Sequence, residues 1–201
     1  DYVNSDGSDI RVTKIDGTTL VAREVAYISP TTNAGELYFV ANGTLSGTYN
    51  GSYYIYYANP TAAEPSANGT YAKESVWVSS YLAVWHFNQN PWTQGTYDST
   101  SNNRNCTQSG NMDVNDLVSG KVNYALDFDG VDDQLDCAGV SAALQSQANL
   151  TMSTWLKRRS ANANISLGTS DGGGYRIGIW SESDANIIQS PDNNGYGYNS
   201  S

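Results

Sequence analysis

Hydrophobic and polar residues alternate along this chain over short stretches, and no long stretch has the spacing of an amphipathic helix. A period of two predicts strands, which clusters of Gly, Asn, Asp and Pro bring to an end. The pattern predicts strands over residues 10–14, 18–28, 36–40, 52–57, 76–78, 82–87, 122–128, 134–137, 150–156, 165–167, 175–180 and 186–189. At most a short turn of helix is expected within residues 139–148, and loops are expected over 61–70, 88–116 and 191–201.

About a dozen short strands with regular turn signals predict an all-β fold, an antiparallel β-sandwich. We expect a domain boundary near residue 80, with a small β-sandwich domain over residues 1–80 and a second β domain over residues 81–201. Trp77, Trp85 and Trp155 fall in the middle of predicted strands and are therefore expected in the core.

Composition excludes some partners. Charged residues make up only 15% of the chain, and the formal net charge is −10. Phosphate binding requires clustered Lys and Arg, so no nucleic-acid partner is expected. The basic run Lys157-Arg158-Arg159 is interpreted as a solvated strand end. No run of apolar residues is long enough to predict a membrane span.

The two cysteines, Cys106 and Cys137, allow one intrachain pairing. A disulfide would close a loop of about 30 residues, stabilise the fold by about 3 kcal/mol and indicate an oxidising compartment. The alternative is two unpaired buried thiols.

The glycosylation pattern Asn-x-Ser/Thr occurs at Asn42, Asn50, Asn68, Asn105, Asn149, Asn164 and Asn199. Chance alone gives many such matches in a chain rich in Asn, Ser and Thr.

Four motifs occur in order: YLAVWHFN at residues 81–88, YDSTSNN at 97–103, ALDFDGVDD at 125–133 and ANLTMSTWLK at 148–157. Their order and spacing resemble the laminin-G-like, concanavalin-A-like jelly roll of bacterial, archaeal and viral surface proteins. The stretches DGSDIRVT at 6–13, DGTTL at 16–20 and YIYYANP at 54–60 resemble a small β domain of unknown function that precedes such jelly rolls. The resemblance implies an extracellular location, at a cell or virion surface.

The chain also departs from the family. The family's Gly-rich loop reads SNNRNC at residues 101–106, and further family strands follow the region that corresponds to Trp180. We likewise expect the first domain to be incomplete at its N-terminus relative to the family. We therefore expect a neighbouring chain or domain to complete the sandwich, through strand exchange or self-assembly.

An acidic segment carries five aspartates within ten residues, Asp127, Asp129, Asp132, Asp133 and Asp136. Carboxylate and amide oxygens are the ligands that Ca²⁺ prefers, although the spacing is not that of an EF-hand. Since the resemblance places the polar loop near this segment, it implies a Ca²⁺ site. The candidate ligands are Asp98, Asn102, Asn103, Asp129, Asp132 and Asp133. The alternative is that Asp129-Gly130 makes a turn and the other carboxylates are solvated.

Exposed aromatic rings can stack on sugar faces, and the ring candidates in or beside loops are Trp92, Tyr97, Tyr175 and Trp180. The alternative is that these rings pack in the core or at an edge. His86 is the only histidine, so it cannot form a histidine-rich metal site, and it is interpreted as a structural residue.

The E-x-D-x-x-E signature of some concanavalin-A-like glycoside hydrolases starts at Glu182 and Asp184, but Ile187 replaces the second Glu. The sequence therefore favours a non-catalytic, extracellular binding or adhesion module for glycans or surface proteins. One alternative is a structural subunit of a virion fibre, a capsid decoration or a surface filament. A glycoside hydrolase is the third and least supported hypothesis.

Overall fold

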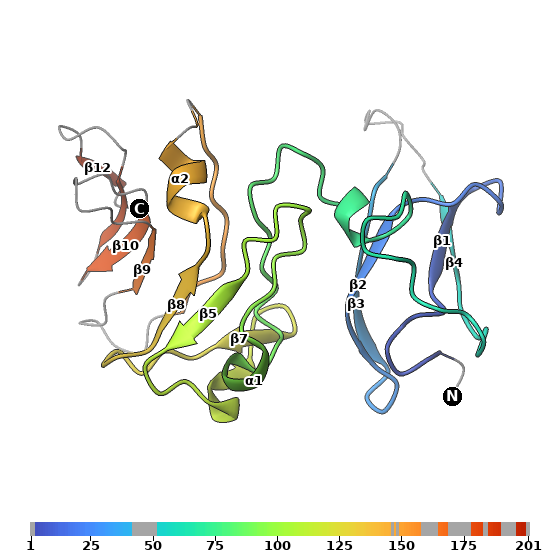
Figure 1. Cartoon of the computed structure of the whole chain (residues 1–201), viewed down its shortest axis with the longest axis horizontal. Helices are drawn as coiled ribbons and strands as arrows, with labels where there is room; N and C mark the ends of the chain where they lie inside the picture. The colour runs from blue at the N-terminus through green and yellow to red at the C-terminus, as the bar shows by residue number, and fades with distance from the viewer. Residues whose placement is uncertain are drawn as a thin grey trace. The chain divides into compact units, whose positions relative to one another are not determined.

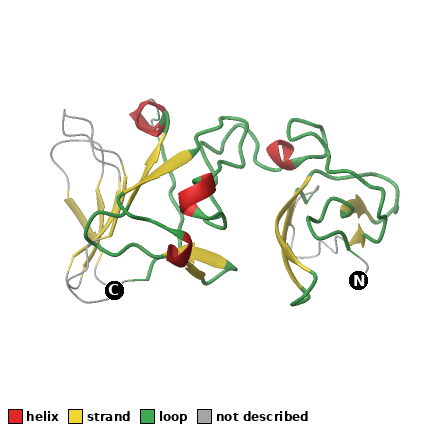
Figure 2. Cartoon of the chain, turned by 60° about the horizontal axis from the view of Figure 1, so that its bottom comes forward, coloured by secondary structure: helices red, strands yellow, loops and turns green. Residues whose placement is uncertain are grey.

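The computed structural model describes residues 3–41, 52–145, 147 and 149–157, together with the backbone of four later strands, Ile165–Gly168, Gly178–Glu182, Ala185–Gln189 and Tyr196–Asn199. The described chain is mostly β, with few short helices (Figure 2). This confirms the β-rich character predicted from the sequence. Among the described residues, no helix is long and apolar enough to cross a membrane.

The strands pair antiparallel in small sheets (Figure 1). The pairs are β1 (Arg11–Lys14) with β4 (Tyr53–Tyr56), β2 (Arg23–Ser29) with β3 (Ala34–Phe39), β5 (Cys106–Ser109) with β8 (Gln134–Cys137), and β6 (Leu117–Ser119) with β7 (Tyr124–Leu126). The four strands β9 (Ile165–Gly168), β10 (Gly178–Glu182), β11 (Ala185–Gln189) and β12 (Tyr196–Asn199) form a sheet in the order β12-β11-β10-β9. The described helices are the 3₁₀ turns Lys73–Ser75 and Val114–Asp116 and the α-helices α1 (Pro91–Gln94) and α2 (Val140–Gln145).

The chain divides into two compact units. The first unit contains Asp1–Asn105 and Asp113–Asp127, and the second contains Cys106–Met112 and Phe128–Ser201. Within the first unit, hydrogen bonds link residues on both sides of position 80, since Glu24 bonds to both His86 and Ser99. The domain boundary expected near residue 80 remains a prediction.

Both polar and apolar side chains are buried in the first unit. Val12 is fully buried, and Arg23 is almost equally so. The Arg23 guanidinium donates to the Ile10 carbonyl at 2.9 Å and to both carboxylate oxygens of Glu64, at 2.6 and 2.7 Å. Because a buried cation requires partners, this pairing fixes the segment around residue 64 against the strands. Residues 61–70 form a loop, as predicted, and Glu64 ties it to the strands.

Several predicted strands are shorter than expected or absent. The stretch 18–28 becomes a strand only at Arg23, because Asp16 accepts hydrogen bonds from the amides of Thr18 and Thr19 and extends the turn after β1. Residues 76–78 follow a 3₁₀ turn and form no strand, while 82–87 contain a single bridge, Trp85 to Asp98. Residues 150–156 form no strand in the described chain, and the expected loop 191–201 contains β12.

Of the three tryptophans expected in the core, two are partly buried and one is exposed. Trp77 and Trp85 are partly buried, and their indole nitrogens donate to Glu24 and to the Arg104 carbonyl, respectively. Trp155 is 73% exposed, so its expected place in the core is wrong. Its segment has no strand assignment, so the alternation that predicted an inward-facing side chain does not apply.

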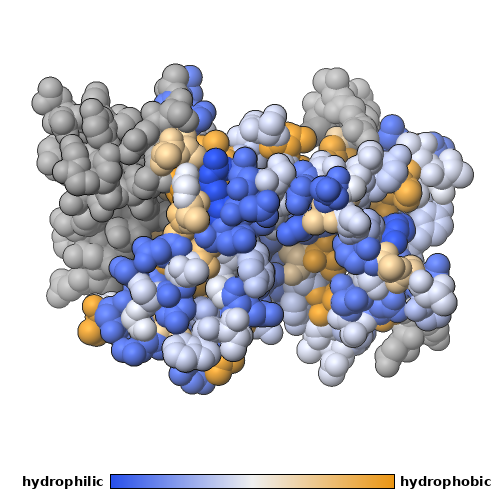
Figure 3. All heavy atoms as spheres, viewed as in Figure 1, coloured by the Kyte–Doolittle hydropathy of each residue, from blue (hydrophilic) through white to orange (hydrophobic). Residues whose placement is uncertain are grey.

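The visible surface is largely polar. Figure 3 shows hydrophilic residues over most of this face, with apolar residues in small separate patches rather than in one continuous area. Isolated apolar side chains are common on protein surfaces, so these small patches do not by themselves indicate a binding surface.

Candidate functional site

A short helix presents Trp92 to solvent. Asn90 precedes α1, and its side-chain oxygen accepts a hydrogen bond from the Trp92 amide at 3.0 Å. Pro91 occupies the first helical turn, where its missing N–H costs nothing, and is buried. The Trp92 side chain is 63% exposed. The capped helix α1, anchored by the buried Pro91, therefore exposes the Trp92 ring, which the sequence predicted as a ligand contact.

Tyr97 lies on the extended segment that follows α1. Its neighbours Thr96 and Asp98 are buried, whereas Tyr97 is 46% exposed. Successive side chains of an extended backbone point in opposite directions, so the burial of the two neighbours turns the tyrosine ring outward. Two of the four predicted ring candidates are thus exposed on one short stretch of the first unit.

The other two ring candidates cannot be described. Tyr175 lies outside the described residues, and Trp180 belongs to β10, of which only the backbone is described. Both remain predictions from the sequence.

Asp98 organises the loop beside Tyr97. One carboxylate oxygen accepts from the amides of Val84 and Thr100, at 3.0 and 2.9 Å. The other accepts from the Thr100 hydroxyl at 2.8 Å and the Arg104 amide at 2.9 Å. A buried carboxylate must be hydrogen-bonded, and these four donors meet that requirement. The structure thus gives Asp98 a loop-holding role, independent of any metal.

The two asparagines predicted with Asp98 also bond to backbone carbonyls. Asn102 donates to the carbonyls of Tyr81 and Leu82, each at 3.1 Å, and Asn103 donates to the Ser101 carbonyl at 3.2 Å. All three predicted ligands of this loop belong to the first unit, whereas the acidic segment after Phe128 belongs to the second. A shared Ca²⁺ site between the two groups remains a prediction.

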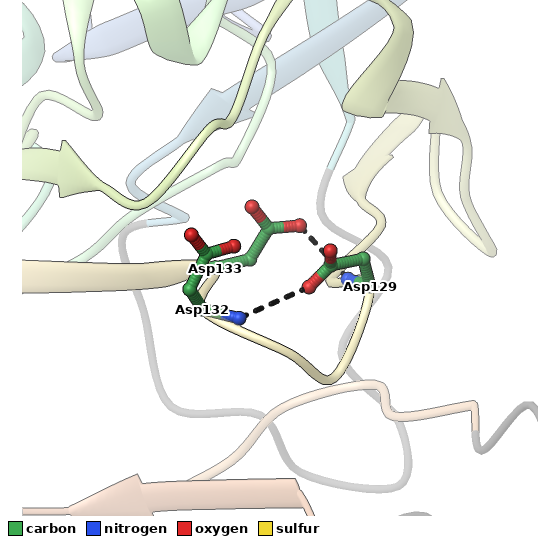
Figure 4. A group of neighbouring side chains, drawn as sticks. All are labelled: Asp129, Asp132 and Asp133. Atoms are coloured by element: carbon green, nitrogen blue, oxygen red, sulfur yellow. Dashed lines mark hydrogen bonds between the residues drawn. The ribbon is translucent and has the colours of Figure 1, made fainter.

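The acidic segment itself brings three carboxylates together (Figure 4). Asp129, Asp132 and Asp133 each offer an oxygen, and these oxygens lie within 4.8 Å of one another. Asp129 accepts from the Val131 and Asp132 amides at 2.7 and 3.3 Å, and its own amide donates to Asp133 at 2.8 Å. These bonds close a tight loop. The turn expected at Asp129-Gly130 is therefore present, and Gly130 has the positive φ of +80° that favours glycine.

The chemistry of this loop fits a hard cation. Three carboxylates are hard oxygen donors, and Ca²⁺ takes six to eight oxygens, so backbone groups or water would complete the shell. Asp132 also accepts from the Asn111 side chain at 3.0 Å, and two of the three carboxylates are exposed. Exposed acidic loops are common without any ion, so Ca²⁺ binding here remains a prediction.

The structure confirms the predicted disulfide between Cys106 and Cys137. The two cysteines face each other across the β5–β8 ladder, which brings their Cα atoms to 3.9 Å. Because disulfides persist mainly in oxidising environments, the bond is consistent with the predicted compartment.

The glycosylation candidates differ in accessibility. Asn68 and Asn149 are exposed, while Asn105 is partly buried and its side-chain oxygen accepts from the Asp98 amide at 2.9 Å. Asn42, Asn50 and Asn164 lie outside the described residues, and Asn199 is described only by the backbone of β12.

Sequence reasoning missed a buried polar cluster around Glu24. This carboxylate accepts hydrogen bonds from Trp77 and Ser99, both at 2.5 Å, and lies 3.1 Å from His86. Tyr38 stacks on the His86 ring with a centroid distance of 4.9 Å. Burial raises the pKa of Glu24, but the bond and charge of His86, with the Ser99 and Trp77 bonds, outweigh it and lower the pKa. No local sequence pattern predicts this cluster, because its members are far apart in the sequence.

No protein-family model, curated protein or solved structure matches the chain.

Proposed function

We propose that this chain is an extracellular, non-catalytic binding module that recognises carbohydrate or protein surfaces, on a sandwich scaffold related to the laminin-G-like jelly roll. The observation that carries the proposal is the exposure of Trp92 and Tyr97 on one loop. Aromatic rings dominate binding energies at interfaces because they bury a large area while giving up few rotatable bonds.

The loop that carries these rings is held in place before any ligand arrives. Asn90 caps α1, and Asp98 fixes the segment after Tyr97 through its four hydrogen bonds. Ordering a loop on binding costs affinity, so a pre-ordered loop binds more tightly than a flexible one with the same rings. This supports a recognition role for the loop.

Two further observations support the remaining parts of the proposal. The Cys106–Cys137 disulfide supports an oxidising, extracellular location. His86, the only histidine, bonds to Glu24, and both side chains are only 8% exposed. A general acid or base must reach its substrate, so this buried pair favours a structural role over catalysis.

Glycan-array binding of the whole chain tests the proposal, together with a W92A/Y97A double variant. We expect the wild type to bind, and the double variant to bind at least about 5-fold more weakly, as the loss of hot-spot rings predicts. Y71A is the matched control, since Tyr71 is also exposed but lies outside the loop. Equal binding by the wild type and the W92A/Y97A variant would exclude a role for this loop.

A structural subunit of a fibre, capsid decoration or filament is the second candidate. The exposure of Trp155 supports it, because a neighbouring chain could cover a ring that the sequence pattern places in a core. Native mass measurement separates the two candidates. A discrete or fibrous assembly favours the structural role, whereas a monomer of 21.7 kDa favours a binding module.

A further inference from the structure

Strand β4 exposes its aromatic side chains to an unusual extent. Tyr54 and Tyr56 are 50% and 47% exposed, and Ile55 and Tyr57 are exposed as well. Successive side chains of a strand point to opposite faces, so a strand packed on a core normally exposes only every second residue. Here the side chains remain accessible on both faces of the strand.

Other tyrosine rings of the first unit are packed against partners. Tyr53 lies 5.0 Å from the Phe39 ring, Tyr38 stacks on His86, and Tyr27 meets Tyr124 edge-on with a centroid distance of 5.5 Å. Tyr57, Tyr71, Tyr81 and Tyr97 are also exposed, so what sets Tyr54 and Tyr56 apart is that their exposed rings lie next to each other on one strand.

Tyr54 and Tyr56 form a tandem pair. They are two residues apart on one strand and so share a face, with ring centroids 6.4 Å apart and planes inclined by 56°. The Tyr56 hydroxyl donates to the Gly17 carbonyl at 3.2 Å, which fixes that ring beside the turn after β1. A Cβ at Gly17 would come within 3.1 Å of this hydroxyl, so glycine leaves room for the ring.

The pair lies on a strand that is hydrogen-bonded to β1. Thr13 lies opposite Tyr54 in β1 and is buried, and Arg11 lies opposite Tyr56. The Arg11 guanidinium donates to the carbonyls of Ser8, Ile10 and Ala63, at 2.7, 2.8 and 2.8 Å. These bonds occupy the cation with the protein's own backbone. The Tyr56 ring is thus held by the turn after β1, and the Tyr54 ring lies beside it.

Charge restricts what the pair can bind. Residues 52–60, SYYIYYANP, contain no Asp, Glu, Lys or Arg, while the whole chain carries a net charge of −10. A polyanion would be repelled by the net charge. An uncharged ligand meets no such repulsion, and it desolvates no charge on this strand.

We propose that Tyr54 and Tyr56 form a stacking platform for a neutral polysaccharide, with each ring contacting the apolar face of a sugar ring. The inference rests on the proposed binding function and assigns it a second surface, apart from Trp92 and Tyr97. A neutral sugar chain has flat apolar faces edged by hydroxyl groups, which suits rings that carry a hydroxyl of their own.

Affinity gel electrophoresis of the whole chain tests the platform. The probes are soluble neutral polysaccharides: a β-1,4-glucan, a β-1,3-glucan, an α-glucan, a mannan and a xylan. We expect at least one to retard the wild type, and the Y54A/Y56A variant to bind it at least about 10-fold more weakly. Y54F/Y56F keeps both rings, so its affinity should stay within about 2-fold of the wild type. Circular dichroism and thermal unfolding confirm that each variant is folded.

The outcomes separate this inference from the proposed function. Retardation that survives in Y54A/Y56A but is lost in W92A/Y97A would overturn the platform and support the loop as the binding surface. Failure of all five polysaccharides to retard the wild type would also overturn the platform, while binding of a protein partner would leave the proposed function standing. Loss of binding in Y54F/Y56F would show that hydroxyl contacts act instead of stacking.

Discussion

Glu24 and His86 are 62 residues apart in the sequence, yet their side chains lie 3.1 Å apart in the first unit. Glu24 also accepts from Trp77 and Ser99, so one carboxylate joins β2 to three later positions of the chain. All of these contacts are made by the carboxylate of Glu24, whose side chain is nearly buried. The cluster is therefore a point where the stability of the unit depends on a single side chain.

Replacing Glu24 with Gln should destabilise the protein by about 1.5–3 kcal/mol at neutral pH, the usual range for bonds to a charged group. The folded state lowers the pKa of Glu24, so its contribution is present above the unfolded pKa of about 4.3 and is lost as pH falls below it. Urea unfolding should therefore separate the wild type from E24Q at pH 7, and the difference should shrink towards pH 3. A pH-independent difference would contradict this assignment.

Glu74→Gln is the matched control for that experiment. Glu74 forms no side-chain hydrogen bond or ion pair within the described part of the chain, so E74Q should change the free energy of unfolding by less than about 0.5 kcal/mol.

Replacing Glu64 with Ala should cost about 1.5–3 kcal/mol, because the buried Arg23 guanidinium would lose both contacts with a carboxylate that is itself half exposed. The cost arises from leaving a buried cation without its partner. An R23M/E64A double variant should recover part of that loss, since it removes the charge as well. Chemical denaturation of the three proteins measures this, and a double variant no more stable than E64A would contradict the explanation.

Removal of the disulfide in a C106S/C137S variant should lower the free energy of unfolding by about 3 kcal/mol, since the bond limits the unfolded chain. A thiol assay on the unfolded, unreduced wild type should find no free thiol. Two free thiols per chain would show that the bond does not form in the isolated protein.

Calcium should raise the melting temperature if the Asp129 loop binds it, because a ligand that binds only the folded state stabilises that state. At about 10 mM Ca²⁺, a site of millimolar affinity would add about 1.4 kcal/mol, and EDTA would remove it. The D129N/D132N variant should lose the effect, whereas D136N, an exposed aspartate outside the group, should keep it. An unchanged melting temperature in the wild type would exclude the site.

The sequence by itself determined the features that depend on neighbours along the chain. Alternation predicted β1, β4 and β8, the Asp16-Gly17 signal predicted the turn after β1, and the two cysteines predicted their bond. Trp92 was named as an exposed candidate because it lies in a long polar stretch, and the short helix α1 that carries it was not predicted. Such local signals result from backbone geometry and side-chain alternation, which a single sequence displays directly.

Only the tertiary structure decided which polar groups meet across the chain. Asp98 is a candidate metal ligand in the sequence, which stays a prediction, and only the fold shows that it accepts four hydrogen bonds from Val84, Thr100 and Arg104. Glu24 lies in an ordinary alternating strand pattern, yet in the fold it is the centre of a buried cluster. Trp155 lies in a similar pattern, yet it is exposed. The physical reason is that a buried polar group depends on partners brought together by chain folding, and sequence periodicity carries no information about partners dozens of residues away.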